Sequence, residues 1–119
     1  MHEKIAAAYF DGWRRRDIDA IAAALHADVT FSGPTARLEG RSAVLAAFRT
    51  LLPMPQALET RHLAVSGDRA MAVYDFVCGE PVGRIPMAEL IGFRDGLITS
   101  IEMFFDPRCL LAPEGHAAG

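Results

Sequence analysis

The stretch from Arg84 to Arg108, RIPMAELIGFRDGLITSIEMFFDPR, decides the fold that we predict for this chain. Two apolar runs lie on either side of Asp95-Gly96, and Asp-Gly is a strong signal for a two-residue β-hairpin turn. The runs carry one glutamate each, Glu89 and Glu102. Because a hairpin this long and apolar must be covered on both faces, we expect helices of the same chain on one face and a partner chain or a ligand on the other.

The composition indicates a single small domain with a large apolar core. The chain has 119 residues, of which 51% are hydrophobic, and this predicts extensive buried area that includes an oligomer interface. The net charge of −3 argues against a nucleic-acid or anionic-membrane surface. No apolar stretch reaches the ~20 residues of a membrane-spanning helix. We expect one domain over residues 1–119, poorly ordered after about residue 110.

The cysteines and the first residues of the sequence indicate the cellular compartment in which we expect the protein. Cys78 and Cys109 lack CxxC spacing, which predicts thiols in a reducing compartment. The first residues, Met1 to Lys4, lack the charged-then-apolar pattern of a signal peptide. We therefore expect a cytoplasmic protein.

The spacing of apolar residues predicts three helices and five strands. Stripes with a period near 3.6 residues predict helices over residues 3–16, 18–25 and 41–52, with Asp17 as the N-cap of the second. Short apolar runs predict strands over residues 29–31, 58–66, 69–78, 84–93 and 97–105. This order, α-α-β-α-β-β-β-β, predicts an α+β fold with the helices on one face of a curved antiparallel sheet.

Several motifs along the chain match those of one protein superfamily. They are Ala8 to Phe10, Arg16 to Ile21, Leu25 to Phe31, Leu38 to Val44, Asp95 to Ile98 and Phe104 to Pro107. Together they resemble the nuclear transport factor 2-like superfamily, which includes ketosteroid isomerases, limonene-1,2-epoxide hydrolases and SnoaL-type polyketide cyclases. The resemblance covers nearly the whole chain and implies a cone-shaped curved sheet. It does not choose an activity, because this fold hosts enzymes, binding modules and interaction domains.

The resemblance implies roles for three residues. Asp75 matches the strand aspartate with which epoxide hydrolases activate water. Tyr9 matches the oxyanion tyrosine of ketosteroid isomerases, and Glu89 matches their protonated aspartate. Other polar members of both sites are replaced, since Phe31 and Gly33 stand where the hydrolases hold the water and Gly33 also stands at the position of the isomerase base. Asp75 is therefore the candidate base for either chemistry.

Strand alternation predicts which side chains face a pocket. If Asp75 and Glu89 face inward, alternation gives the inner set Met71, Val73, Asp75, Val77, Met87, Glu89, Ile91 and Phe93. On the last strand, the resemblance implies that Leu97, Thr99, Ile101, Met103 and Phe105 face inward. A two-residue turn at Gly67-Asp68 would pair His62 with Val73 and Thr60 with Asp75 on the same face. Around a small hydrophobic ligand, the predicted contacts are Trp13, Phe31, His62, Val73, Met87, Ile91, Met103 and Phe105.

Two functions fit these residues. In the first, a cofactor-independent isomerase, cyclase or epoxide hydrolase uses Asp75 as general base, while protonated Glu89 and Tyr9 donate to a developing oxyanion. In the second, a non-catalytic dimeric module binds a ligand or a partner, Glu89 only satisfies the core, and His62 is a packed histidine. We expect no metal and no cofactor, because the histidines lack ligand spacing and no phosphate-binding glycine loop is present.

The outer face of the sheet is also predicted to be apolar. Alternation places Tyr74, Phe76, Leu90, Ile98 and Phe104 there. Soluble monomers rarely expose an apolar patch of that size, so we expect a homodimer built on the outer sheet face.

Overall fold

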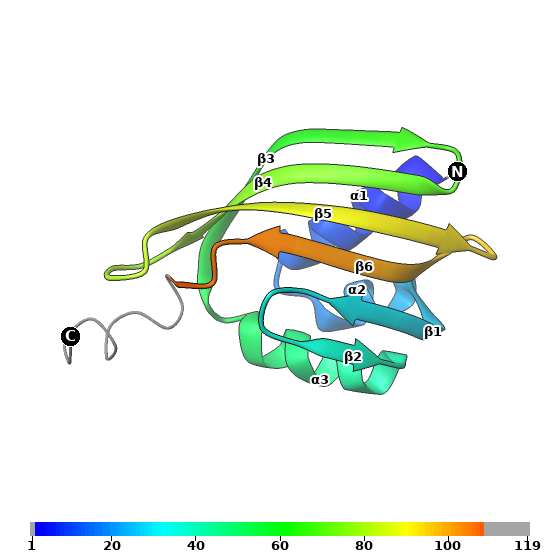
Figure 1. Cartoon of the computed structure of the whole chain (residues 1–119), viewed down its shortest axis with the longest axis horizontal. Helices are drawn as coiled ribbons and strands as arrows, with labels where there is room; N and C mark the ends of the chain where they lie inside the picture. Colours follow the sequence, from blue (N-terminus) through cyan, green and yellow to red (C-terminus); the bar gives the residue numbers. More distant parts are fainter. Residues whose placement is uncertain (1, 109–119) are drawn as a thin grey trace.

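The computed structural model describes residues 2–108, and the disorder predicted after about residue 110 lies outside these residues. Figure 1 shows the elements of this part of the chain. They are α1 (His2–Arg14), α2 (Ile18–Ala24), β1 (Leu25–Ser32), β2 (Arg37–Glu39), α3 (Arg41–Leu51), β3 (Pro55–Ser66), β4 (Arg69–Cys78), β5 (Arg84–Arg94) and β6 (Leu97–Phe105). None of the helices in residues 2–108 is long and apolar enough to cross a membrane.

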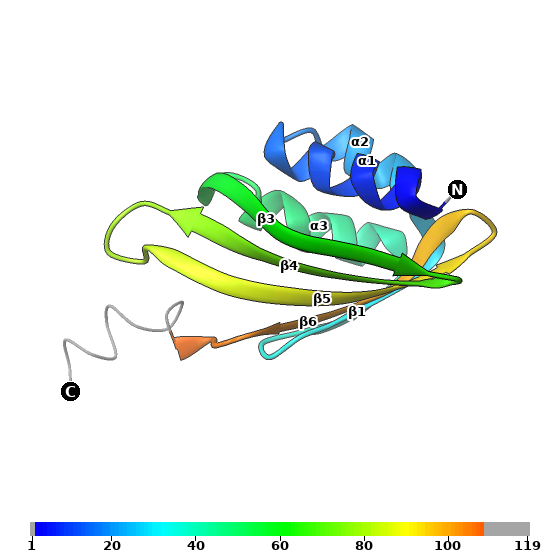
Figure 2. The ribbon, with the colours of Figure 1, turned by 90° about the horizontal axis from the view of Figure 1, so that it is seen from above.

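The described strands form one curved sheet in the order β2-β1-β6-β5-β4-β3. Neighbouring strands are antiparallel except β1 and β6, which are parallel. The helices lie together on one face of this sheet, and no element of the described chain covers the other face (Figure 2). This arrangement confirms the predicted α+β fold. It also defines an inner face toward the helices and an outer face away from them.

The prediction misses β2 and the first half of β1. The three residues of β2 include one apolar side chain, Leu38, so they are too short to show a period of two. β1 begins at Leu25, where the prediction places the end of a helix. Leu25 pairs with Ile98 and Thr30 with Ser100, so the register shifts between the two pairs and hides the strand period.

The two hairpin turns are confirmed. Arg94 pairs with Leu97, which leaves Asp95 and Gly96 as a two-residue loop with φ of 56° and 73°. Positive φ at both positions is what a type I′ turn requires, and Asp-Gly adopts it readily. Ser66 and Arg69 enclose Gly67-Asp68 as a second two-residue loop, in which Gly67 has a φ of 61°. These turns pin the register on both sides of β4 and β5.

Helix α1 packs closely on α2 and presents an aromatic stripe to the sheet. Gly12 permits the close approach, because a Cβ there would lie 3.0 Å from Ile21 Cγ1 and 3.2 Å from the Ile21 nitrogen. Tyr9, Phe10 and Trp13 are all buried on the opposite side of the helix. Asp17 caps α2 as predicted, accepting a hydrogen bond from the Ala20 N–H at 3.1 Å. Trp13 lies in an apolar environment, next to Phe48 and Phe76.

The predicted alternation is right for β5 and wrong for β4. On β5 the inner residues are Ile85, Met87, Glu89, Ile91 and Phe93, all buried. On β4 the buried inner residues are Ala70, Ala72, Tyr74, Phe76 and Cys78, so Val73 and Asp75 lie on the outer face. Both sets on β4 are mostly apolar, and the prediction took its phase from Asp75. The two aromatic rings gain more by burial than Val73 does, and Asp75 finds cations on the outer face.

Two bulges change the predicted positions on β3 and β6. His62 pairs with Val73 as predicted, but the register shifts at Arg61, so Thr60 pairs with Tyr74 and Asp75 with Glu59. His62 is exposed on the outer side of the sheet. On β6 the register shifts between Gly92 and Phe93, which turns Ile98 into the core, where it is fully buried. A one-residue insertion moves every following side chain to the opposite face.

Candidate functional site

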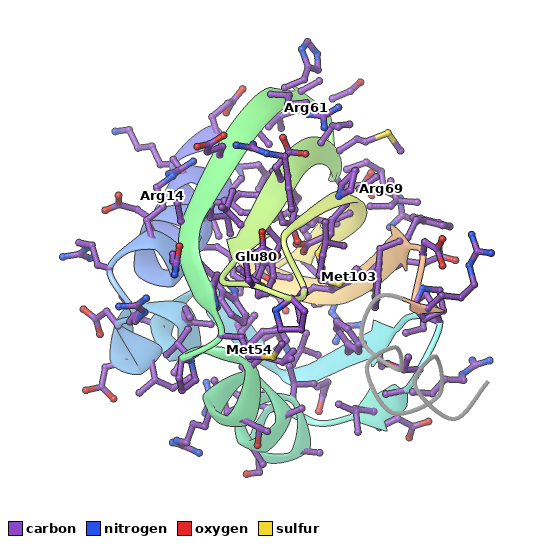
Figure 3. All side chains as sticks on the ribbon, turned by 90° about the vertical axis from the view of Figure 1, so that its left-hand side faces the viewer. Arg14, Met54, Arg61, Arg69, Glu80 and Met103 are labelled. Atoms are coloured by element: carbon purple, nitrogen blue, oxygen red, sulfur yellow. The ribbon has the colours of Figure 1, made fainter. Side chains whose placement is uncertain are left out.

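A cavity of about 300 Å³ lies between α1, α3 and the inner face of the sheet. Five of the predicted ligand contacts line it, and they are Trp13, Phe31, Met87, Met103 and Phe105. The prediction missed other wall residues, which are Thr35, Ala36, Leu38, Ala47, Phe48, Thr50, Leu51, Met54, Leu58, Tyr74 and Phe76. In Figure 3, Met54 and Met103 lie on the helix side of the sheet, while Arg61 and Arg69 lie at its periphery. The wall holds no carboxylate, histidine or cationic side chain.

Aromatic contacts hold the cavity wall in place. The Trp13 ring meets two other rings edge to face. Its centroid is 5.0 Å from that of Phe48 and 6.3 Å from that of Phe76. Phe31 meets Phe48 at 5.9 Å in a T-shaped pair. In the sequence, the apolar stripe of α3 indicates that Phe48 and Leu51 face the core. Strand alternation on β4, in contrast, places Tyr74 and Phe76 on the wrong face of the sheet.

A buried hydrogen-bond network lies next to this cavity. Glu89 is 1% exposed, and its carboxyl group accepts a hydrogen bond from the Tyr9 hydroxyl at 3.2 Å and another from the Tyr74 hydroxyl. Tyr9 on α1 and Glu89 on β5 are thus in direct contact. Neither Tyr9 nor Glu89 lines the cavity. Of the three residues that these hydrogen bonds join, Tyr74 is the one that forms part of the wall.

Burial changes the proton affinity of this network. Removal from water raises the pKa of Glu89 from 4.5 to about 7, and the hydrogen bonds from Tyr74 and Tyr9 oppose this rise. Burial also raises the pKa values of Tyr9 and Tyr74 well above 10, and the neighbouring Glu89 charge adds to that effect. The carboxyl group therefore exchanges its proton near neutral pH, while both tyrosines stay protonated.

The predicted general base lies elsewhere. Asp75 is on the outer face, where Arg61 donates to its Oδ1 and Arg84 Nη1 lies 2.9 Å from its Oδ2. The same Arg84 nitrogen lies 2.6 Å from Glu59 Oε1. The hydrogen bond from Arg61, supported by Arg84, lowers the pKa of Asp75. The two guanidinium groups cover the carboxylate and leave its side chain 8% exposed, although each arginine is half exposed itself.

The structure therefore places six of the predicted site residues outside the cavity wall. Asp75, Val73 and His62 lie on the outer side of the sheet, which corrects their placement in the pocket. Tyr9, Glu89 and Ile91 are buried on the inner side but do not line the cavity. The physical reason is the phase of β4, since Asp75 and Val73 follow that strand and His62 pairs with Val73. Residues 2–108 contain no group of three acidic, histidine or cysteine side chains that is able to hold a metal ion.

The fold and the cavity define a class of protein. The architecture is that of the nuclear transport factor 2-like fold, in which helices and a curved sheet enclose an apolar cavity. The chain belongs to the SnoaL-like domain family, whose model matches residues 6–101. A comparison with proteins of curated function finds no significant match.

Solved structures of other proteins have the same fold. A protein of Kribbella flavida DSM 17836 is similar over 98% of this chain and 96% of its own, with 24% identity and a TM-score of 0.88. A nuclear transport factor 2-like protein of Cytophaga hutchinsonii ATCC 33406 is similar over 93% of this chain and 95% of its own, with 21% identity and a TM-score of 0.82. A ketosteroid isomerase-like protein, also of Kribbella flavida DSM 17836, is similar over 88% of this chain and 77% of its own, with 25% identity and a TM-score of 0.79.

Proposed function

We propose that this protein binds a small, uncharged, largely apolar ligand in the cavity. The observation that carries the proposal is the chemistry of the wall, which combines aromatic rings and methionines with no carboxylate, histidine, lysine or arginine. A charged ligand would lose its hydration there without gaining a partner. Such an enclosed apolar space with few polar groups is typical of small-molecule sites.

The size of the cavity limits the affinity. A ligand that buries roughly 300 Å² of apolar surface gains about 7 kcal/mol at ~25 cal/mol per Å², and association costs about 4 kcal/mol or more in lost motion. The difference, about 3 kcal/mol, corresponds to a dissociation constant in roughly the millimolar range.

Trp13 makes binding directly measurable. It is the only tryptophan in the chain and it lines the cavity. We expect the neutral apolar dye N-phenyl-1-naphthylamine to quench Trp13 emission and to gain fluorescence itself on titration. Ala47 lines the cavity and Ala46, its neighbour on α3, is exposed, so Ala47→Met and Ala46→Met form a matched pair. Loss of dye binding in Ala47→Met alone supports the site, and equal binding in both variants contradicts it.

A second function is favoured by the buried Glu89. A carboxyl group with a pKa of about 7, hydrogen-bonded to two tyrosines, is suited to acid-base catalysis near neutral pH. In this case ionised Glu89 would take the proton from the carbon next to the carbonyl and return it to the γ-carbon, and Tyr9 would donate to the oxyanion that forms in between. A substrate would have to pass Tyr74 in the cavity wall to contact Glu89. Asp75 takes no part because it lies across the sheet. Isomerisation of cyclohex-3-enone to the conjugated enone, followed by absorbance, tests it. A rate equal to that of Glu89→Gln would exclude this function.

We also propose that a second copy of the chain covers the outer face of the sheet. Met71 and Phe104 are 46% and 48% exposed there, and Leu90 lies between them in the sheet. Arg69 and Glu102 flank this patch, and neither forms an ion pair within residues 2–108. A cation and a carboxylate on one face make that face electrostatically complementary to itself.

The spacing of the cysteines in the sequence keeps the cytoplasm as the proposed location.

A further inference from the structure

We propose that filling the cavity with a neutral apolar ligand is coupled to proton uptake by Glu89, and that Tyr74 is the positioning residue that transmits the coupling. This inference rests on the proposed ligand site. It adds a regulation of that site, because the proton concentration then sets the affinity.

The geometry puts Tyr74 between the ligand space and the carboxyl group. Among residues 2–108, Tyr74 alone both lines the cavity and donates a hydrogen bond to Glu89. Its ring is 2% exposed and is held edge to face by Phe10, with centroids 5.6 Å apart. A ligand in the cavity therefore packs against a side chain whose other end touches the carboxyl group.

Within residues 2–108, the side chains that donate hydrogen bonds to Glu89 are the two tyrosines and none is charged. Tyr9 reaches it from α1, and its neighbours across the strands are Ala72 on β4 and Met103 on β6, which do not titrate. Met103 also lines the cavity, so it brings the ligand space near Glu89 from a second strand. The carboxylate of Asp75 lies on the other face of the sheet. Burial is thus the largest influence on the proton affinity of Glu89.

The direction of the coupling follows from desolvation. An apolar ligand that fills the space beside Tyr74 and Met103 keeps water out of it. The ionised carboxylate loses more by this than the neutral acid does, so the bound state holds the proton more tightly. By linkage, a ligand that raises proton affinity binds more tightly when the carboxyl group is already protonated. Affinity must therefore fall as pH rises through neutrality.

The test is the pH dependence of dye binding by the intact protein. We expect N-phenyl-1-naphthylamine to bind about two- to threefold more weakly at pH 8 than at pH 6, as a ligand-induced shift of ~0.5 pKa unit produces. Titration in weakly buffered solution at pH 7 should show proton uptake on binding. Glu89→Gln should bind with equal affinity at both pH values, and Glu102→Gln, which changes an exposed carboxylate, should behave as wild type.

The variant Tyr74→Phe distinguishes a role of Tyr74 in the coupling to Glu89 from a role in packing alone. It keeps the ring in the wall but removes a hydrogen bond that lowers the pKa of Glu89, so the midpoint of the pH profile should move upward. A merely structural role for the ring leaves the midpoint unchanged, and that result would overturn the assignment of Tyr74. Wild-type binding that is equal at pH 6 and pH 8 would overturn the coupling itself. If the dye does not bind at either pH, the proposed ligand site fails and the coupling fails with it.

Discussion

Asp75 on β4 and Glu89 on β5 lie on adjacent strands but on opposite faces of the sheet. Asp75 pairs with Pro86 and Glu89 with Ala72, so neither register nor side-chain direction brings the two carboxyl groups together. Each has a separate environment, with two arginines around Asp75 and two tyrosines around Glu89. This separation is why the cavity lacks the predicted base, and it makes the two residues separable by mutation.

The pH dependence of stability should report Glu89. Its pKa is raised from 4.5 to about 7 by folding, so its stabilising contribution is complete below pH 4.5 and is lost as pH rises to about 7. Urea unfolding of the wild type should therefore lose on the order of 2–3 kcal/mol between pH 5 and pH 8 through this group. Glu89→Gln should remove most of that slope. An unchanged slope in the variant would show that Glu89 does not titrate in this range.

Substitution of Asp75 should affect stability and leave the cavity intact. Asp75→Asn removes the charge that Arg61 and Arg84 share, and the lowered pKa of Asp75 means that its stabilising contribution is present above pH 4 and is lost in acid. We expect a lower melting temperature at pH 7 with a dye dissociation constant within about twofold of wild type. Loss of dye binding in a folded Asp75→Asn protein would contradict the outer-face position.

Phe104 should matter for assembly. It is 48% exposed on the outer face, so Phe104→Glu places a charge in the proposed interface and should yield monomer or aggregate in sedimentation velocity. Ala46→Glu on the helix side, also exposed, is the control and should keep the wild-type state. A wild-type monomer at micromolar concentration would end the dimer proposal.

Native Trp13 emission should be blue-shifted. The side chain is 6% exposed and packs against Phe48 and Phe76, so iodide should quench it only weakly. Denaturation in urea should shift the emission to the red and restore quenching. Strong iodide quenching of the native protein would place Trp13 outside the core and would also remove the basis of the dye assay.

The helices, the long strands and the hairpin turns were predictable because their signals are local. Asp95-Gly96 adopts the two positive φ angles that its residues favour, and Asp17 caps the helix that follows it. The apolar stripe of α1 likewise shows where Tyr9 and Trp13 are buried. In each case, residues that are close in the sequence are sufficient to specify the local geometry.

The contents of the site depend on the phase of each strand, and only the tertiary structure decides that phase. On β4 both alternating sets are largely apolar, so the sequence of the strand alone does not distinguish them. Tyr74 faces inward because the helices offer its ring a core and its hydroxyl a buried carboxylate. Asp75 then faces outward, where the bulge at Arg61 and the start of β5 at Arg84 supply cations from residues distant in the sequence.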